Sequence, residues 1–162
     1  MEKKSLNKPE FVYVTYISAT PEKVWNALLD PELTKQYWAR RRNASDWKVG
    51  SPWQHRDYDN AGLVDIVGKV VESVPPRRLV LTWAFPADAA NPAKHSRVTF
   101  EIEPFMGAVR LTVTHDELEP DSPMLRGITQ GWPAVLSSLK TLLETGKPLP
   151  FTTTREGWHE NP

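Results

Sequence analysis

One amphipathic pattern near the C-terminal end constrains the fold more than any other feature of the sequence. Between Ser122 and Gly146 the apolar residues recur with the 3.6-residue period that places them on one face of a helix. They are Leu125, Ile128, Trp132, Val135, Leu136, Leu139, Leu142 and Leu143. The pattern predicts one helix of about 24 residues, started by Pro123 and bent at Pro133, whose apolar face needs another layer to cover it.

The residues before this helix predict that other layer. Runs in which apolar and polar residues alternate indicate strands with one buried face, and they occur at residues 11–18, 47–49, 53–58, 63–74, 79–85, 98–103 and 109–115. After the first run, Thr20–Pro21 and Asp30–Pro31 are typical helix starts and predict two short helices. The expected fold class is α+β: a helix-grip, in which a curved antiparallel sheet of about seven strands wraps round the long C-terminal helix, with two short helices after strand one.

Length and charge favour one domain with a neutral or locally charged partner. The 162 residues suit a single core, and we expect a polar N-terminal extension at residues 1–10, a helix-grip domain at 11–147 and an irregular tail at 148–162, from which Phe151 and Trp158 could pack on the domain. Twenty basic side chains balance twenty acidic ones, which does not favour nucleic acid. No signal-peptide or membrane-span pattern is visible, so we expect a cytoplasmic protein with no membrane partner.

Motifs of catalysis and cofactor binding are absent from the sequence. Without cysteine there is no thiolate nucleophile and no cysteine-bound metal. The four histidines stand in separate predicted elements without the spacing of metal ligands, and the neighbours His115 and Asp116 should point to opposite faces of a strand. Asp116 is therefore expected on the outward, solvated face. We predict no catalytic residue, no metal and no cofactor.

Four stretches resemble a known family when their order and spacing are taken together. They are ATPEKVWNALLDPELTKQYW at 19–38, WKVGSPW at 47–53, GKVVESVPPRRLVLTW at 68–83 and GWPAVLSSLKTLLETG at 131–146. On these residues the chain resembles the START-like, or SRPBCC, superfamily of the birch-pollen-allergen type, and within it the branch of heat-shock-protein-90 ATPase activator homologues. The resemblance implies a helix-grip fold and, from other members, an interior that holds a small ligand. It does not by itself imply the co-chaperone function that names the branch.

Aromatic residues dominate the faces that a helix-grip brings together. A ligand held between the sheet and the long helix would contact Trp38, Trp53, His55, Trp83, Phe85, Phe100, Leu111, His115, Ile128, Trp132 and Leu136. The alternative is that these side chains fill a solid core. His55 and His115 bear most on the choice, because a histidine in an apolar wall needs a hydrogen-bond partner, either a ligand or a neighbouring side chain.

Two smaller features bear on the same cavity. Arg40, Arg41 and Arg42 form either a solvated loop or a cationic rim that would attract a carboxylate or phosphate group. Gly127 and Gly131 lie four residues apart on the long helix. They leave room either for close contact between helix and sheet or for a pocket.

Three functions are compatible with these patterns. The preferred one is non-catalytic binding of a small apolar or amphipathic molecule. The second is a protein-interaction module, a chaperone or stress-response regulator, that uses an exposed apolar patch to bind a protein partner or to form a homodimer. The third is a cyclase- or hydrolase-like enzyme in which His55 or His115 acts as acid or base beside Tyr37 or Tyr58.

Overall fold

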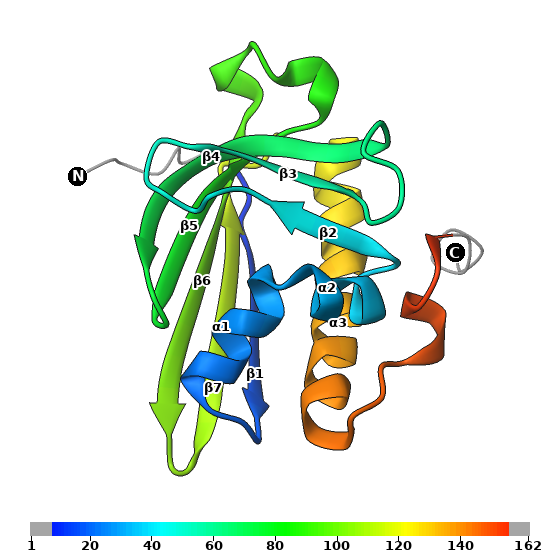
Figure 1. Ribbon diagram of the computed structural model, residues 1–162. Coiled ribbons are helices and arrows are strands. Elements are labelled where there is room, and N and C mark those ends of the chain that lie inside the picture. Colours follow the sequence, from blue (N-terminus) through cyan, green and yellow to red (C-terminus); the bar gives the residue numbers. More distant parts are fainter. Residues whose placement is uncertain (1–7, 156–162) are drawn as a thin grey trace.

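A seven-stranded antiparallel sheet forms one layer of the computed structural model, which describes residues 8–155 (Figure 1). The strand order is β1-β7-β6-β5-β4-β3-β2, so that the first two strands in the sequence lie at opposite edges. The strands are β1 (Phe11–Ile17), β2 (Arg41–Ala44), β3 (Pro52–Asp57), β4 (Val64–Val74), β5 (Arg78–Trp83), β6 (Ser96–Phe105) and β7 (Ala108–Asp116).

Three helices follow the caps that the sequence predicts. They are α1 (Pro21–Leu29), α2 (Pro31–Tyr37) and α3 (Pro123–Thr145). The side chains of Thr20, Asp30 and Ser122 each accept a hydrogen bond from a backbone N–H in the first turn of their helix. Gly146 ends α3 with a φ of 84°, a left-handed conformation that glycine adopts without strain. The predicted α+β helix-grip is therefore confirmed.

The sheet curls around α3, which lies along its concave side (Figure 1). Two register shifts, between His55 and Arg56 and between Val70 and Glu72, interrupt the ladders of β3–β4 and β4–β5, and such bulges increase the local twist of a strand. Gly68 marks the tightest approach in β4, since a Cβ atom there would lie 1.9 Å from the carbonyl oxygen of Thr82. The curl leaves α3 covered by strands on one side and by α1 and α2 on another.

The position of one strand differs from the prediction. Residues 47–49 do not form a strand, and Trp47 has a left-handed φ of 62°. The side chains of Ser45 and Asp46 accept hydrogen bonds from the backbone N–H groups of Trp47 and Lys48, which makes a turn. The edge strand is instead β2, whose residues Arg41–Ala44 carry no apolar alternation and are held by pairing with β3. Alternation of side chains could not reveal this strand because three of its four residues are polar.

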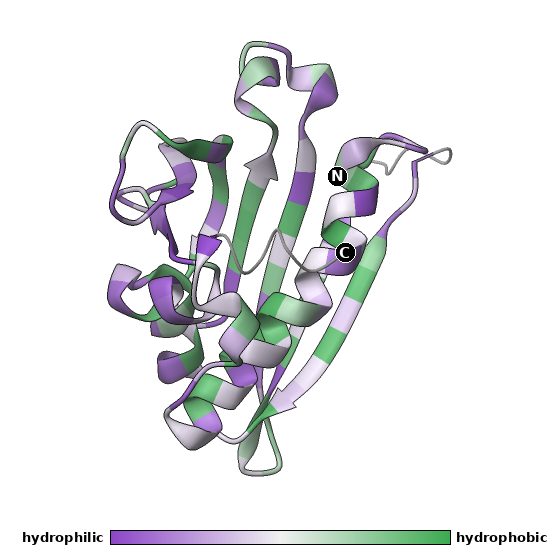
Figure 2. Cartoon of the chain, turned by 90° about the vertical axis from the view of Figure 1, so that its right-hand side faces the viewer, coloured by the Kyte–Doolittle hydropathy of each residue, from purple (hydrophilic) through white to green (hydrophobic). Residues whose placement is uncertain are grey.

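The core fills most of the space between the sheet and the helices. Its strand residues include Ile17, Trp53, Leu79, Leu81, Phe100, Ile102, Val109, Leu111 and Val113, and its helix residues include Val24, Leu28, Leu136 and Leu139. Along β1, more and less hydrophobic residues alternate in part (Figure 2), and the hydrophobic side chains of Val12 and Val14 face outward, about half exposed. The expectation of a solvated Asp116 was wrong: this side chain is only 8% exposed, at the end of β7 and in register with Arg97 of β6.

The segment after α3 packs back on the domain. Residues 150–152 form a single turn, and the carbonyl of Thr152 accepts a hydrogen bond from Ala39 N at 2.7 Å while its hydroxyl contacts Ser138 Oγ at 2.6 Å. Within the predicted tail, the described residues 148–155 thus contain one short turn and pack on the domain. Residues 1–7 of the expected extension and Trp158 of the tail lie outside the described residues.

No helix within residues 8–155 combines the length and the apolar composition needed to cross a membrane.

Candidate functional site

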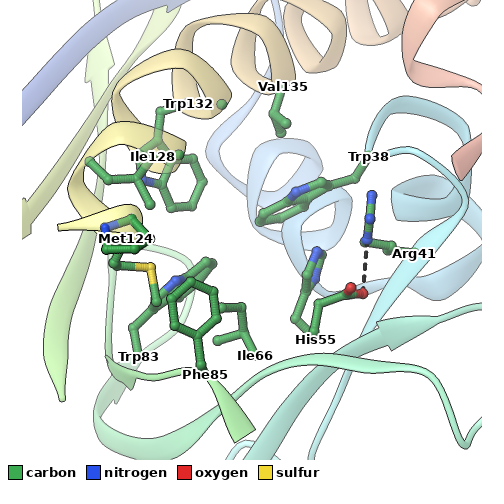
Figure 3. Close-up of a pocket in the computed structure, with 14 residues that line it drawn as sticks. Trp38, Arg41, His55, Ile66, Trp83, Phe85, Met124, Ile128, Trp132 and Val135 are labelled. Carbon is green, nitrogen blue, oxygen red and sulfur yellow. Dashed lines mark hydrogen bonds and ion pairs between the residues drawn. The ribbon is translucent and has the colours of Figure 1, made fainter. Parts of the chain in front are cut away.

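A cavity of about 200 Å³ lies between the N-terminal half of α3 and the facing strands (Figure 3). Phe85 is 40% exposed and Gly127 is also exposed, so the cavity opens to solvent between them. A dry cavity of about 150 Å³ is known to hold benzene, so this volume suits one substituted aromatic ring. The lining residues are Trp38, Arg41, His55, Asp65, Ile66, Trp83, Phe85, Pro123, Met124, Gly127, Ile128, Gly131, Trp132 and Val135.

Six of the eleven residues predicted to bind a ligand line this cavity. They are Trp38, His55, Trp83, Phe85, Ile128 and Trp132. The other five lie elsewhere on the concave side: Trp53 and Phe100 border a void of only about 10 Å³, while Leu111, His115 and Leu136 are fully buried. These five side chains belong to the buried interior of the domain, whereas the cavity lies beside the N-terminal half of α3.

Aromatic rings make a continuous wall across the cavity. The ring centroid of Trp132 lies 5.5 Å from that of Trp38 and 5.4 Å from that of Trp83, and Trp38 lies 4.6 Å from the ring of His55. Tilted and edge-on contacts at these separations are favourable and fix each ring against its neighbours. A ligand therefore meets a wall whose shape is set before binding.

His115 uses both ring nitrogens inside the protein. The indole Nε1–H of Trp132 donates to Nδ1 of His115 at 3.0 Å, so this nitrogen carries the lone pair and Nε2 carries the proton. Nε2 then donates to Ser96 Oγ at 2.7 Å, and this hydroxyl donates to the Trp83 carbonyl at 3.1 Å. Burial lowers the pKa of His115 to about 3, so the ring is neutral. Its partners are neighbouring side chains, one of the two arrangements that the sequence left open.

His55 uses only one ring nitrogen. Asn43 donates its Nδ2–H to the carbonyl of Leu28 at 2.8 Å, which turns its Oδ1 towards Nδ1 of His55, also at 2.8 Å. Since an amide oxygen only accepts, Nδ1 must carry the proton. Burial, with a smaller effect of Arg41, lowers the pKa of His55 to about 3, so the second nitrogen, Nε2, has a free lone pair. No hydrogen bond within residues 8–155 engages it.

Trp83 contributes a second unpaired polar atom to the wall. Its Nε1–H is buried and has no hydrogen-bond partner among the described residues. Trp53, by contrast, donates its Nε1–H to the carbonyl of Thr82 at 2.9 Å. A buried donor without a partner costs free energy on the order of 1–3 kcal/mol, so the indole of Trp83 favours any acceptor that reaches it.

The ionic groups at the cavity form a closed cluster. Arg41 is 6% exposed and its Nε donates to Asp65 at 2.9 Å. Arg155, from the C-terminal segment, binds both oxygens of the same carboxylate at 2.6 and 3.0 Å, and lies 3.8 Å from Asp57. Burial raises the pKa of Asp65, but the two arginines outweigh this and lower it overall. Of the three arginines at 40–42, Arg41 is thus buried and paired with Asp65. The interpretation of the run as a solvated loop is wrong for this residue.

Some cavity residues carried a sequence signal and others did not. Met124, Gly127 and Gly131 stand on the same helical stripe as Ile128 and Trp132, so two glycines on the apolar face indicate missing side-chain volume. Asp65 and Ile66 had no such signal, because their place at the cavity depends on the curl of β4. Val135 belongs to the predicted stripe, and a stripe alone does not separate cavity residues from core residues.

The tyrosines proposed for an enzyme do not reach the cavity. The hydroxyl of Tyr37 donates to the carbonyl of Ala27 at 2.6 Å, and that of Tyr58 donates to Glu32 at 2.5 Å, in an exposed position. Neither residue lines the cavity. Within residues 8–155, no group of three or more histidine and carboxylate side chains is placed to hold a metal ion.

Comparisons with known proteins place this geometry in a family. Residues 18–144 match the family described as Activator of Hsp90 ATPase homolog 1-like protein. Among solved structures, the protein MLL2253 from Mesorhizobium loti is 27% identical, with a TM-score of 0.68 over 84% of this chain and 97% of its own. A protein from Cytophaga hutchinsonii is 26% identical, with a TM-score of 0.66 over 86% and 96%.

A third solved structure is an Aha1 dimer from Colwellia psychrerythraea, which is 23% identical, with a TM-score of 0.66 over 86% of this chain and 98% of its own. At this identity the likeness concerns the fold alone. None of the curated proteins matches the chain in sequence.

Proposed function

The chain belongs to the family of Activator of Hsp90 ATPase homolog 1-like proteins, and on that premise we propose that it binds a small apolar or amphipathic molecule, without converting it, in the cavity between the sheet and α3. The observation that carries the proposal is the cavity of about 200 Å³ with four aromatic side chains and a histidine in its walls. Concave, mostly apolar sites with a few polar atoms are typical of small-molecule binding.

The state of the histidines supports binding rather than catalysis. A general base works best when its pKa lies near the working pH. His55 has a pKa of about 3 and is therefore a weak base near neutral pH, while His115 has both nitrogens engaged. Neither is placed as an efficient acid or base.

Filling the cavity from Gly127 tests the proposal. A Cβ atom at this position would meet nothing within 4 Å, so a side chain can start there, and Gly127→Leu adds volume at the cavity. The matched control is Gln130→Leu, which adds a leucine on the exposed face of the same helix, away from the cavity. We expect ligands from a library of small aromatic compounds, detected by tryptophan fluorescence, to lose at least about tenfold in affinity with Gly127→Leu and to bind Gln130→Leu normally.

Two results would contradict the proposal. Equal affinities of both variants would remove the cavity as the binding site. Conversion of a bound compound, detected by mass spectrometry after incubation, would replace binding with catalysis.

A specific surface favours a second candidate, association with another copy of the chain. β1 is an edge strand whose outward side chains Val12, Val14 and Tyr16 are 45–50% exposed, beside Phe105 and the 92% exposed Met106. Exposed edges and apolar patches favour strand pairing between molecules, and one solved structure of the same fold is described as a dimer. Sedimentation equilibrium of the wild-type protein and of Val14→Lys tests this candidate: a dimer lost in the variant supports it, and a wild-type monomer at all concentrations removes it.

A further inference from the structure

We propose that the cavity selects an apolar ring carrying one uncharged group that both donates and accepts a hydrogen bond, such as a primary amide or a hydroxyl. This inference rests on the proposed function and names the chemical class of its ligand. In the arrangement we infer, the ligand donates to Nε2 of His55 and accepts from Nε1 of Trp83. Both residues line the cavity and are about 95% buried.

The acceptor is created by a side chain behind the cavity wall. Asn43 is anchored by the Leu28 carbonyl and holds the proton of His55 on Nδ1. The opposite nitrogen is left as a bare acceptor in a cavity whose other lining atoms are mostly apolar. A ligand that covers Nε2 of His55 without donating a hydrogen bond leaves a buried acceptor without a partner. The free-energy cost of this lowers the affinity for such ligands.

The indole of Trp83 differs from two neighbouring indoles, those of Trp132 and Trp53, in having no hydrogen-bond partner among the described residues. The Nε1–H groups of Trp132 and Trp53 donate to His115 and to the Thr82 carbonyl, so the protein itself satisfies them. That of Trp83 has no partner within residues 8–155 although the atom is buried. The ring centroids of Trp83 and His55 lie 6.3 Å apart, with the ring planes inclined by 27°, so the two side chains are neighbours in the cavity wall.

The charges around the cavity disfavour a negatively charged ligand group. Arg41 is the cation that lines the cavity, and it already pairs with Asp65, which Arg155 binds as well. A carboxylate would meet the lone pair of His55 Nε2 and would have to compete with Asp65 for Arg41. This geometry favours a neutral group over the carboxylate or phosphate that a cationic rim would attract.

Four probes of nearly equal shape separate these interactions. Benzamide offers a donor and an acceptor, acetophenone only the acceptor, cumene neither, and benzoate a charge. Because the probes differ in hydration, their absolute affinities are less informative than the change in each affinity ratio when one protein group is removed. His55→Leu should reduce the preference for benzamide over acetophenone, and Trp83→Phe the preference for acetophenone over cumene, each roughly threefold to tenfold.

Trp53→Phe is the matched control for the indole. It removes a nearby ring N–H that does not line the cavity and should leave both ratios unchanged within about twofold, even if the protein is less stable. A measurement on the wild-type protein stands beside the variants, in case one does not fold. The Trp83 indole N–H signal in a nitrogen-15 NMR spectrum should move downfield with acetophenone and benzamide but not with cumene.

The possible results separate this inference from the proposed function. If cumene and acetophenone bind but no ratio changes in the variants and the Trp83 signal does not move, the hydrogen-bonding inference is wrong while the cavity remains a binding site. Benzoate as the tightest ligand would also overturn it. If none of the four probes binds, the proposed function fails, and the inference fails with it.

Discussion

At the scale of single residues, two buried histidines in one aromatic wall have opposite tautomers. Trp132 donates to Nδ1 of His115, whereas Asn43 accepts from Nδ1 of His55. In each case the first hydrogen bond decides which nitrogen keeps the proton. The ring of His115 consequently has both nitrogens hydrogen-bonded and links β7 to α3. The ring of His55 has an acceptor, Nε2, without a partner at the cavity.

These histidines predict how stability depends on pH. Burial lowers both pKa values from the ordinary 6.5 to about 3, so between these limits the unfolded chain binds protons that the folded protein does not. The stabilisation that comes from burying the two neutral rings is therefore complete above pH 6.5 and is lost as the pH falls towards 3. Each ring lowers the free energy of unfolding by up to about 1.4 kcal/mol per pH unit in this window. Urea unfolding across this window measures the slope.

Single replacements check the assignment. His115→Gln and His55→Gln should each reduce by roughly half the change of the unfolding free energy with pH between 6.5 and 3. This holds whatever each replacement does to stability near neutral pH. A slope that neither replacement changes would mean that these rings are not the neutral, buried groups described above.

At the scale of secondary-structure elements, β2 is a polar strand that carries part of the site. Its inward side chains are Arg41 and Asn43, which lie in register with Asp57 and His55 of β3. Arg41 bonds Asp65 of β4, and Asn43 bonds His55 of β3 and the end of α1. Specific polar contacts, rather than an apolar face, attach this edge strand to the domain.

The arginines around the start of β2 should therefore differ in their effect on stability. Arg41→Ser removes the partner of Asp65 that is only 6% exposed. Because Arg155 still binds Asp65, we expect the free energy of unfolding to fall by about 1–3 kcal/mol. Arg40→Ser breaks a solvent-exposed pair with Asp59, whose attraction water and salt screen, and should leave the denaturant midpoint nearly unchanged. Denaturant midpoints compare the two. Equal losses would contradict the contrast between a buried and an exposed pair.

At the scale of the whole molecule, an aromatic cluster joins α2, the sheet and α3. Trp132 contacts Trp38, Trp83 and Phe100 at ring centroid distances of 5.4–5.8 Å and donates to His115. One side chain thus connects the long helix to the residue that ends α2 and to β5, β6 and β7. The same cluster forms the cavity wall, so the stability of the domain and the shape of the site depend on common contacts.

Trp132 offers a test of that connection. Trp132→Ala should destabilise the fold by about 3–5 kcal/mol, because it removes a large buried ring. Trp132→Phe keeps an aromatic ring but leaves Nδ1 of His115 without its donor, and should cost about 1–3 kcal/mol. Chemical denaturation gives both values, and a wild-type midpoint for Trp132→Ala would show that the ring does not anchor the helix.

The sequence by itself determined the architecture. The period of α3, the caps at Thr20, Asp30 and Ser122 and the left-handed Gly146 are local properties of a few neighbouring residues, so they could be predicted without the fold. The alternation of six of the seven strands is equally local. These elements leave few arrangements other than a sheet wrapped round one helix, and that arrangement is the one observed.

Only the tertiary structure decided where the cavity lies and which polar atoms face it. Strand alternation placed Trp53, Phe100 and Leu111 on the concave side together with His55 and Trp83, but the curl of the sheet packs the first three into the core and leaves the other two at the cavity. The pairing of Arg41 with Asp65, like the opposite tautomers of the histidines, joins residues far apart in the sequence. Such contacts depend on distances and angles set by packing, and neither hydrophobic period nor capping pattern carries that information.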